Sequence, residues 1–332
     1  MNYPTVDIIT VTYNSFSDMK KYFEGIKEIN YPKNKLKLYI RDNASMDNTV
    51  EIVKNEWAGI KKSITTNKDN VGFSKGNNQA IEKSNAKYIL FLNPDTYITK
   101  DCIRILVDFL EKNKEYGFAG GKLLKLDGTI DSAGILLTKN RKFADRGIGK
   151  KETKEFNKEE DIFAICGAGL LCKRRMLEDI KVMEEYFDED FFAYYEDIDL
   201  CWRAGKMGWK GKYIPKAVIY HKRGHDLEPF TLRRWTSHTK KRRAYIKNDK
   251  IKIGRRLLFR NSILILFKEE ELSTLLKNSI PILGRLIGRL AYIALFEGYL
   301  LKEVSTIADL IPVMIEKRKE INMKKNERSI DS

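Results

Sequence analysis

Three carboxylates lie within four positions of the chain, at Glu196, Asp197 and Asp199. They follow the aromatic run 191–195 and stand at the start of a helical pattern. Aromatic neighbours exclude water, and a carboxyl group held among them can have its pKa moved into the range that suits proton transfer. Acidic residues are also common at helix N-termini, because they interact favourably with the positive end of the helix dipole. Taken alone, the cluster fits either a general base or an ordinary helix start.

Polar residues also follow three short apolar runs in the N-terminal third of the chain. The runs 6–11, 37–40 and 88–92 end in Thr12-Tyr13-Asn14, Asp42-Asn43 and Asn93-Pro94-Asp95, respectively. Each cluster is compatible with turn chemistry. In open α/β sheets, however, ligands bind at the carboxyl ends of strands, so we expect the three clusters to share one crevice. The P-loop and dinucleotide-binding glycine patterns are absent from the sequence.

The elements that must position these residues alternate between strand and helix. The pattern predicts helices over 17–29, 48–57, 74–84 and 101–112 and a further strand over 62–65. Strand-helix alternation of this kind predicts a parallel sheet wrapped by helices. Later in the chain we predict strands over 118–125, 130–138 and 210–220, the last ending at His221, and a mobile loop over 140–161.

Composition bounds the class of protein. The chain has 332 residues, of which 42% are hydrophobic, enough for a folded core. Its four cysteines are scattered without a metal-binding spacing, so we expect reduced core residues. No basic segment followed by an apolar one opens the sequence, and we expect no signal peptide.

The net charge of +16 is concentrated in one segment. Residues 233–256 contain eleven basic side chains and one acid, and they lead into apolar, helix-like sequence at 257–267 and 282–301. The second stretch has the length of a membrane span but contains Arg285, Arg289 and Glu297, which are costly inside a bilayer. We therefore predict an amphipathic helix at an anionic membrane surface. The alternative is that these helices pack on the catalytic domain or on another subunit.

Five segments, taken together and in order, resemble the nucleotide-sugar-dependent family 2 glycosyltransferases of the GT-A fold. They are VDIITVTYN at 6–14, DNASMD at 42–47, NVGFSKGNN at 70–78, FLNPD at 91–95 and FDEDFFAYYEDIDLCWR at 187–203. The last segment is typical of the rhamnosyltransferase-like branch, and the resemblance covers roughly residues 4–225. It implies an α/β, Rossmann-like, mostly parallel central sheet with helices on both faces. We expect this domain over 1–230, followed by a basic, amphipathic helical region over 231–332.

The resemblance also implies roles for individual residues. Asp95 would bind Mg²⁺ or Mn²⁺ and bridge it to the donor diphosphate, with Asn93 in place of the usual first carboxylate. That replacement removes one charge, so the metal is expected to arrive with the nucleotide. Asp42 would contact the nucleoside, and Thr12, Tyr13 and Asn14 would line its pocket. Lys75 is either a diphosphate ligand or a solvent-exposed cation.

Asp197 is the implied general base, with Glu196 as the alternative. Asp199 and Arg203 are four residues apart and are predicted to form a supporting ion pair. His221 is either a second metal ligand, as the equivalent residue is in some relatives, or a structural histidine.

The implied activity is inverting transfer of a sugar from a nucleoside-diphosphate donor, with dTDP-L-rhamnose as the first choice and UDP- or GDP-sugars as alternatives. The expected acceptor is a polyprenyl-diphosphate-linked glycan at the cytoplasmic face of the cell membrane, for polysaccharide synthesis. A homo-oligomer is compatible with this scheme. Two other classes remain open at this point. They are a basic nucleic-acid-binding protein, although no recognition motif is present and no nucleic acid is expected, and a non-catalytic subunit of the same fold.

Overall fold

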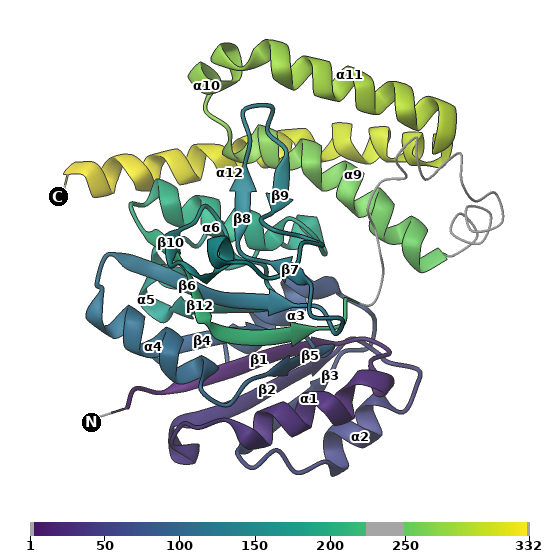
Figure 1. The fold of residues 1–332 in the computed structure, drawn as a ribbon. Coiled ribbons are helices and arrows are strands. Elements are labelled where there is room, and N and C mark those ends of the chain that lie inside the picture. The colour runs from purple at the N-terminus through teal and green to yellow at the C-terminus, as the bar shows by residue number, and fades with distance from the viewer. Residues whose placement is uncertain (1–2, 224–248, 331–332) are drawn as a thin grey trace.

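The computed structural model describes residues 3–223 and 249–330. A curled sheet has helices on both faces, and a layer of C-terminal helices lies along one side of it (Figure 1). The main strands are β1 Val6–Thr12, β2 Leu36–Asp42, β3 Lys61–Thr66, β4 Tyr88–Leu92, β5 Thr96–Ile98, β6 Tyr116–Leu124, β7 Ile130–Ser132, β8 Ile135–Leu137, β9 Phe143–Asp145, β10 Glu160–Asp161, β11 Gly169–Lys173 and β12 Lys210–His221. The α-helices are α1 Phe16–Glu28, α2 Thr49–Asn55, α3 Gly72–Ile81, α4 Cys102–Lys112, α5 Arg174–Asp179, α6 Glu196–Lys206, α9 Asp249–Glu269, α10 Leu272–Lys277, α11 Ser279–Phe296 and α12 Glu303–Ile330.

The first four strands form the parallel block that the strand-helix alternation predicts. β1 lies between β2 and β4, and β3 pairs with the other side of β2, all in parallel. Every residue of β1 and β4 is buried, which explains why both segments are continuous apolar runs. The register sets Thr12 beside Asp42, so the polar residues that end these strands share one edge of the sheet.

Beyond β4 the sheet is mixed. β11 pairs antiparallel with both β4 and β6, and β6 pairs in parallel with β12. The register shifts between Ile214 and Val218, and the last residues of β12 pair with β5. This pairing brings His221 opposite Thr96, the residue after Asp95.

The predicted mobile loop over 140–161 is instead ordered structure. β9 pairs with β8 as a hairpin, and a 3-10 turn at Lys154–Asn157 buries Phe156. The hairpin rises toward the C-terminal helices, where Arg141 forms an ion pair with Glu270 (Figure 1). The prediction was wrong because these charged residues are held by partners far away in the sequence.

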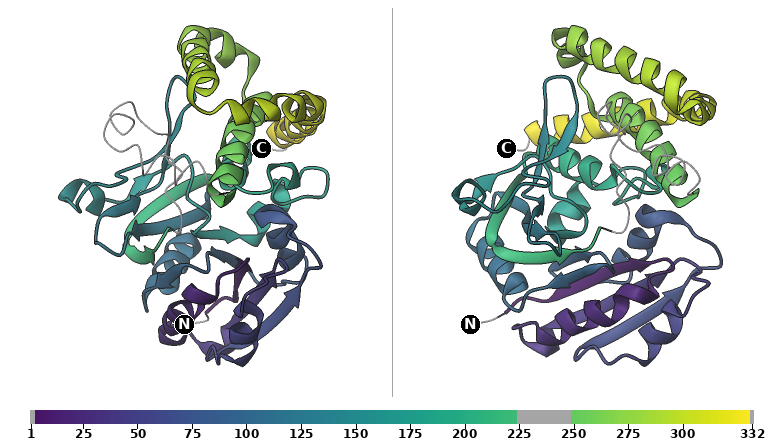
Figure 2. Two further views of the ribbon diagram at one scale, coloured as in Figure 1. Left: turned by 90° about the vertical axis from the view of Figure 1, so that its right-hand side faces the viewer. Right: turned by 45° about the vertical axis from the view of Figure 1, so that its right-hand side comes forward.

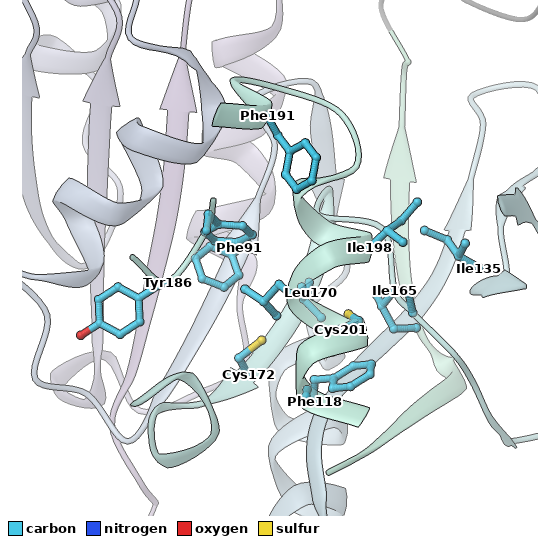
Figure 3. Packing of buried hydrophobic residues seen from close by; sticks show 14 of the residues in the cluster. Phe91, Phe118, Ile135, Ile165, Leu170, Cys172, Tyr186, Phe191, Ile198 and Cys201 are labelled. Carbon is cyan, nitrogen blue, oxygen red and sulfur yellow. The ribbon is translucent and has the colours of Figure 1, made fainter. Parts of the chain in front are cut away.

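Two apolar layers fix the helices to the sheet. One face packs against α1 and α4, and the other packs against α3, α5 and α6. Figure 3 shows part of the second layer, in which Leu170 and Cys172 lie near Cys201 of α6. All four cysteines are free, as predicted, and three of them are buried.

The C-terminal helices pack on the rest of the protein. α9 and α12 lie against each other and against the loop before α6, while α10 and α11 lie on their outer side (Figures 1 and 2). The predicted domain boundary at 230/231 and most of the basic segment 233–256 fall within 224–248, outside the described residues. The division into domains therefore stays a prediction.

A buried network of charged groups joins the two parts. The amino group of Lys268 on α9 lies 2.7 Å from Asp188 and 2.6 Å from Asp199 of α6, and Lys317 on α12 lies 2.6 Å from Asp188. The predicted pair of Asp199 with Arg203 is confirmed at 2.8 Å, with both side chains buried. Burial by itself raises the pKa of Asp188, but the two lysines outweigh burial and hold this pKa below its usual value.

We expect Asp188→Asn to destabilise the whole chain, because it leaves Lys268 and Lys317 buried with too little negative charge. Breaking a buried pair on one side costs about 3–5 kcal/mol of unfolding free energy. Urea unfolding followed by circular dichroism measures this change. Lys319→Ala is the matched control, since its pair with Glu316 is exposed and contributes little. Equal unfolding midpoints for Asp188→Asn and the control would contradict the role of the network.

Candidate active site

Asp42 ties the ends of the first two strands to the loop that follows them. Its buried carboxylate accepts a hydrogen bond from the Thr12 hydroxyl at 2.9 Å. It also accepts from the backbone N–H of Ser45 at 2.9 Å and from the Ser45 hydroxyl at 2.5 Å. Thr12 and Asp42 are thus brought together as the sequence predicted, and each holds the other in place.

Tyr13 and Asn14, the two residues after Thr12, differ in their exposure and hydrogen bonding. Tyr13 exposes 42% of its surface and is open to solvent. Asn14 has a positive φ of 50°, donates its N–H to the Ser45 hydroxyl and accepts from the N–H of Met46 at 2.8 Å. Asn14 therefore shapes the loop, which leaves Tyr13 as the open aromatic face beside Asp42.

Asp95 and His221 meet at the end of the sheet, although 126 positions separate them. The Nε2 atom of His221 lies 3.3 Å from Asp95 Oδ1, and its Nδ1 atom lies 2.8 Å from the buried carboxylate of Asp131. Burial lowers the pKa of His221, but the hydrogen bonds to Asp131 and Asp95 outweigh burial and raise it to about 9. The imidazole is held by carboxylates on both sides.

Asn93 was expected in place of the first carboxylate of the metal motif, and Lys75 was expected to be either a diphosphate ligand or a solvent-exposed cation. The Oδ1 atom of Asn93 is buried and has no hydrogen-bond partner among the described residues. Lys75 is half-exposed and its amino group lies 2.9 Å from Glu189, which raises the pKa of the lysine. Lys75 is therefore already neutralised by a carboxylate within the protein.

The loop before α6 has a strained backbone that several elements hold in place. Phe192, Tyr194 and Tyr195 all have positive φ, a conformation that non-glycine residues rarely adopt. The backbone N–H groups of Phe73 and Ser74, at the start of α3, donate to the carbonyl of Phe192. Gly72 is required at this contact, because a Cβ there would lie 2.6 Å from Phe192.

Asn261 of α9 holds the same loop from the other side. Its side-chain NH₂ group lies 2.9 Å from the carbonyls of Phe191 and Ala193 and 2.7 Å from that of Tyr194. The C-terminal helices thus set the conformation of the chain immediately before Glu196 and Asp197.

Asp197 is partly buried at the start of α6. One carboxylate oxygen accepts from the N–H of Gly167 at 2.8 Å and the other from the N–H of Ile198 at 2.8 Å. Burial raises the pKa of Asp197 to about 6, and the two backbone hydrogen bonds limit that rise. Asp197 is therefore largely ionised at neutral pH yet basic enough to accept a proton.

Glu196 is placed less favourably for that role. Its side chain is buried, and its Oε2 atom has no hydrogen-bond partner in the described part of the chain. Burial and the neighbouring charge of Asp197 raise the pKa of Glu196 well above its usual value. Glu196 therefore holds its proton to a higher pH than an ordinary glutamate does.

The acidic cluster and the Asp95 site belong to one region. Partial desolvation raises the pKa of the Tyr194 hydroxyl, and the nearby charges of Glu196 and Asp95 add to this rise while Arg223 opposes it. Arg223 in turn pairs with Asp145 at 2.8 Å, and the charge of Asp145 raises the pKa of Asp197. The end of β4 is also connected to the predicted base, because the N–H of Asn93 donates to the carbonyl of Ala168 and the N–H of neighbouring Gly167 donates to Asp197.

Comparison with known proteins identifies the family. The sequence profile of glycosyl transferase family 2 matches residues 7–181. The chain belongs to this family. It is a glycosyltransferase of the rhamnosyltransferase-like branch.

Two rhamnosyltransferases are similar over most of their length. Rhamnosyltransferase WbbL of Escherichia coli (strain K12) is 27% identical over 74% of this chain and 94% of its own length. The N-acetylglucosaminyl-diphospho-decaprenol L-rhamnosyltransferase of Mycobacterium tuberculosis (strain ATCC 25618 / H37Rv) is 21% identical over 66% of this chain and 76% of its own.

Solved structures share the GT-A fold. Staphylococcus aureus TarS 1-349 in complex with UDP has a TM-score of 0.54 at 13% identity, over 97% of this chain and 91% of that chain. The mannosyltransferase PcManGT from Pyrobaculum calidifontis, in complex with GDP-Man and Mn²⁺, has a TM-score of 0.51 at 16% identity. The match covers 96% of this chain and 88% of that chain. At these identities the likeness shows the fold alone.

The donor set at Asp95 fits a divalent cation that is completed by substrate. Within residues 3–223 and 249–330, no cluster of three or more His, Cys, Asp or Glu side chains has the arrangement of a metal site. Asp95 and His221 could offer two ligands once a cation displaces the proton from Nε2 of His221, and Asp131 orients the imidazole as carboxylates do behind metal-bound histidines. A family 2 glycosyltransferase with two protein ligands would need phosphate oxygens to complete the coordination.

Sequence reasoning missed Asp131, Asp145, Gly167 and Asn261. Asp131 and Asp145 lie in the irregular part of the sheet, where no motif marks them. Gly167 acts through its backbone N–H, and Asn261 sits in an apolar helix. Only the Asn within the otherwise apolar stretch 257–267 was a visible signal.

We expect kcat/KM for sugar transfer to fall as the pH drops through about 6. Asp197 has a raised pKa, so acid protonates it and removes the proton acceptor. Because Glu196 titrates with it, the measured value belongs to the pair. Rates measured between pH 4.5 and 8 give the profile, with protein stability checked at each pH. A profile that stays flat down to pH 5 would contradict the assignment.

Proposed function

We propose that this glycosyltransferase moves a deoxysugar, with inversion, from a nucleoside-diphosphate donor to a hydroxyl of a lipid-linked glycan. The observation that supports the chemistry best is Asp197, a partly buried carboxylate held by two backbone N–H groups in the same region as Asp95 and His221. Inversion needs one base on the acceptor hydroxyl and one neutralised leaving group, and this region offers one candidate for each.

In this proposal Asp197 takes the proton from the acceptor hydroxyl as that oxygen attacks the anomeric carbon. Asp95 and His221 would hold a divalent cation, which would supply the positive charge that the departing diphosphate needs. Asp131 keeps the His221 ring oriented for that task. The strained loop at 192–195 would fix the position of Asp197 at the start of α6.

The nucleoside is proposed to bind at the ends of β1 and β2. Tyr13 offers an open aromatic face for the base, and Asp42 organises the loop beneath it through Thr12 and Ser45. Asn93 supplies a buried amide oxygen that lacks a partner among the described residues. Lys75 is excluded from direct charge neutralisation as long as its pair with Glu189 persists.

The first choice of donor is dTDP-L-rhamnose. Two rhamnosyltransferases among the similar proteins support it, at 27% and 21% identity. The fold neighbours were solved with UDP and with GDP-Man, so UDP- and GDP-sugars are the alternatives that an experiment must include.

The proposed acceptor is a glycan on a polyprenyl diphosphate, at the cytoplasmic face of the membrane. The name of the mycobacterial relative describes such an acceptor for that protein. Among the described helices, α11 is the one long and apolar enough to cross a membrane by length and composition. Its most exposed side chains are apolar, with Ile280 at 84% and Ile287 at 65%, and we propose that this face rests on the membrane.

A thermal-shift screen of nucleotide sugars tests the donor and the metal together. We expect dTDP-L-rhamnose with Mn²⁺ to raise Tm the most, because binding to the folded state alone stabilises it. Asp95→Ala should lose the metal-dependent part of that shift while its own Tm without ligand stays close to the wild-type value. A larger shift with a UDP- or GDP-sugar would overturn the choice of donor. If the donor raises the Tm of the wild type and of Asp95→Ala by the full amount without metal, the proposed role of the divalent cation would be contradicted.

Flotation with phosphatidylglycerol liposomes tests the membrane surface. We expect the wild-type chain to float with the vesicles and Leu283→Asp/Ile287→Asp to lose most of that binding. Each apolar side chain buried in lipid contributes about 1.5–3 kcal/mol, and a charged replacement reverses that gain. Leu126→Asp, at a similarly exposed leucine far from α11, is the matched control and should still float. Equal flotation of all three proteins would contradict this surface.

A further inference from the structure

Helix α11 presents its arginines to the protein and its apolar residues to the outside. Arg285 and Arg289 are one turn apart and both are partly buried, and Arg289 contacts Ser262 of α9. Leu283, Ile287 and Leu290 on the same helix are exposed. This arrangement is the reverse of an ordinary surface helix, in which charged groups face water.

Among the described residues, the hydrogen-bond and ring contacts of Arg289 are with neutral groups, although Glu297 is near enough for its charge to act on the guanidinium. One nitrogen donates to the hydroxyl of Ser262, another lies 3.3 Å from the carbonyl of Leu258, and the guanidinium lies 5.2 Å from the ring centre of Phe259. None of these partners carries a negative charge. The positive charge of Arg289 is thus solvated but not neutralised by its hydrogen-bond partners.

Arg285 has fewer hydrogen-bond partners than Arg289 among the described residues. Its Nε and Nη2 atoms are buried and have no hydrogen-bond partner among the described residues. Burial lowers the pKa of Arg285, and for Arg289 the proximity of Arg285 adds to the same effect. A buried polar group without a partner costs free energy, and a charged one costs more.

Other arginines in this region have carboxylate partners. Arg255 pairs with Glu297, Arg256 with Glu303, and Arg141 with Glu270. Arg260 and Arg318, by contrast, donate to neutral groups. Arg285 and Arg289 differ from these single arginines in that they lie together, one turn apart, on one face of α11. Such a pair is the arrangement expected when an external anion supplies the missing charge.

The two arginines also lie close to the catalytic loop. Arg289 donates to the Ser262 hydroxyl, and the adjacent Asn261 lies 2.7 Å from the carbonyl of Tyr194. Burial raises the pKa of the Tyr195 hydroxyl, and the charges of Arg289 and Arg285 oppose that rise. Tyr195 directly precedes Glu196 and α6. An anion at Arg285 and Arg289 would therefore lie on the α11 side of the proposed base, while Asp95 and His221 supply the ligands proposed for the donor diphosphate.

We propose that Arg285 and Arg289 bind the diphosphate group of the acceptor lipid. This inference rests on the proposed function, because it assumes a glycan attached to a lipid diphosphate. Binding there would set the acceptor sugar beside Asp197 and the lipid chain beside the exposed apolar face of α11. The same helix would then recognise both the head and the tail of the acceptor.

The test compares two acceptors that carry the same glycan, one on a short alkyl diphosphate and one on a neutral alkyl chain. We expect Arg285→Gln and Arg289→Gln each to raise KM for the diphosphate acceptor by about tenfold or more, the loss of a charged hydrogen bond. KM for the neutral acceptor should change little, and Arg→Lys at either position should recover part of the loss. Lys277→Gln, at an exposed cation of neighbouring α10, is the control and should behave as wild type.

Binding of the donor's nucleoside diphosphate, measured by calorimetry, separates the two diphosphates and confirms that each variant is folded. Unchanged nucleotide affinity with a selective loss of the diphosphate acceptor supports the proposal. Weaker nucleotide binding with an unchanged acceptor KM would assign the arginines to the donor and overturn it. An equal loss for both acceptors would show a purely structural role. Wild-type protein that transfers to the neutral acceptor but never to the diphosphate one would instead refute the proposed acceptor class.

Discussion

The buried charges around Asp188 and Asp199 are the constraint on which the rest of the molecule depends. Lys268 lies between the two carboxylates, and Lys317 and Arg203 complete the balance of charge. Ions removed from water are stable only when every charge has its partner, so α6, α9 and α12 must be present together. The C-terminal helices are for this reason a structural part of the catalytic unit.

The same packing explains how a strained loop can hold a catalytic carboxylate. Three residues with positive φ precede α6, and each conformation of this kind costs free energy. Hydrogen bonds from α3 on one side and from Asn261 of α9 on the other offset that cost. Asp197 is then held by the Gly167 N–H, with burial raising its pKa into a useful range.

The sequence predicts well what is local. Apolar runs located β1, β2 and β4, their polar ends marked one edge of the sheet, and the spacing of Asp199 and Arg203 predicted their pair. Prediction from the sequence failed where contacts with residues far away in the chain determine the local structure. The charged segment over 140–161 is ordered by pairing and by Arg141 with Glu270, and Asp131 gains its place only when β12 brings His221 to it. The direction in which Arg285 and Arg289 face also depends on tertiary packing.

The central claim is that Asp197, and not its neighbour Glu196, accepts the proton. The most direct test is the rate of nucleoside diphosphate release with donor and acceptor present, in Asp197→Asn and Glu196→Gln. We predict a fall of at least about a hundredfold in Asp197→Asn, the order expected for a lost general base. Glu196→Gln should keep much of its rate, because the carboxylate oxygen Oε2 of Glu196 has no hydrogen-bond partner among the described residues and its raised pKa disfavours the charged form. A fully active Asp197→Asn with an inactive Glu196→Gln would contradict the claim.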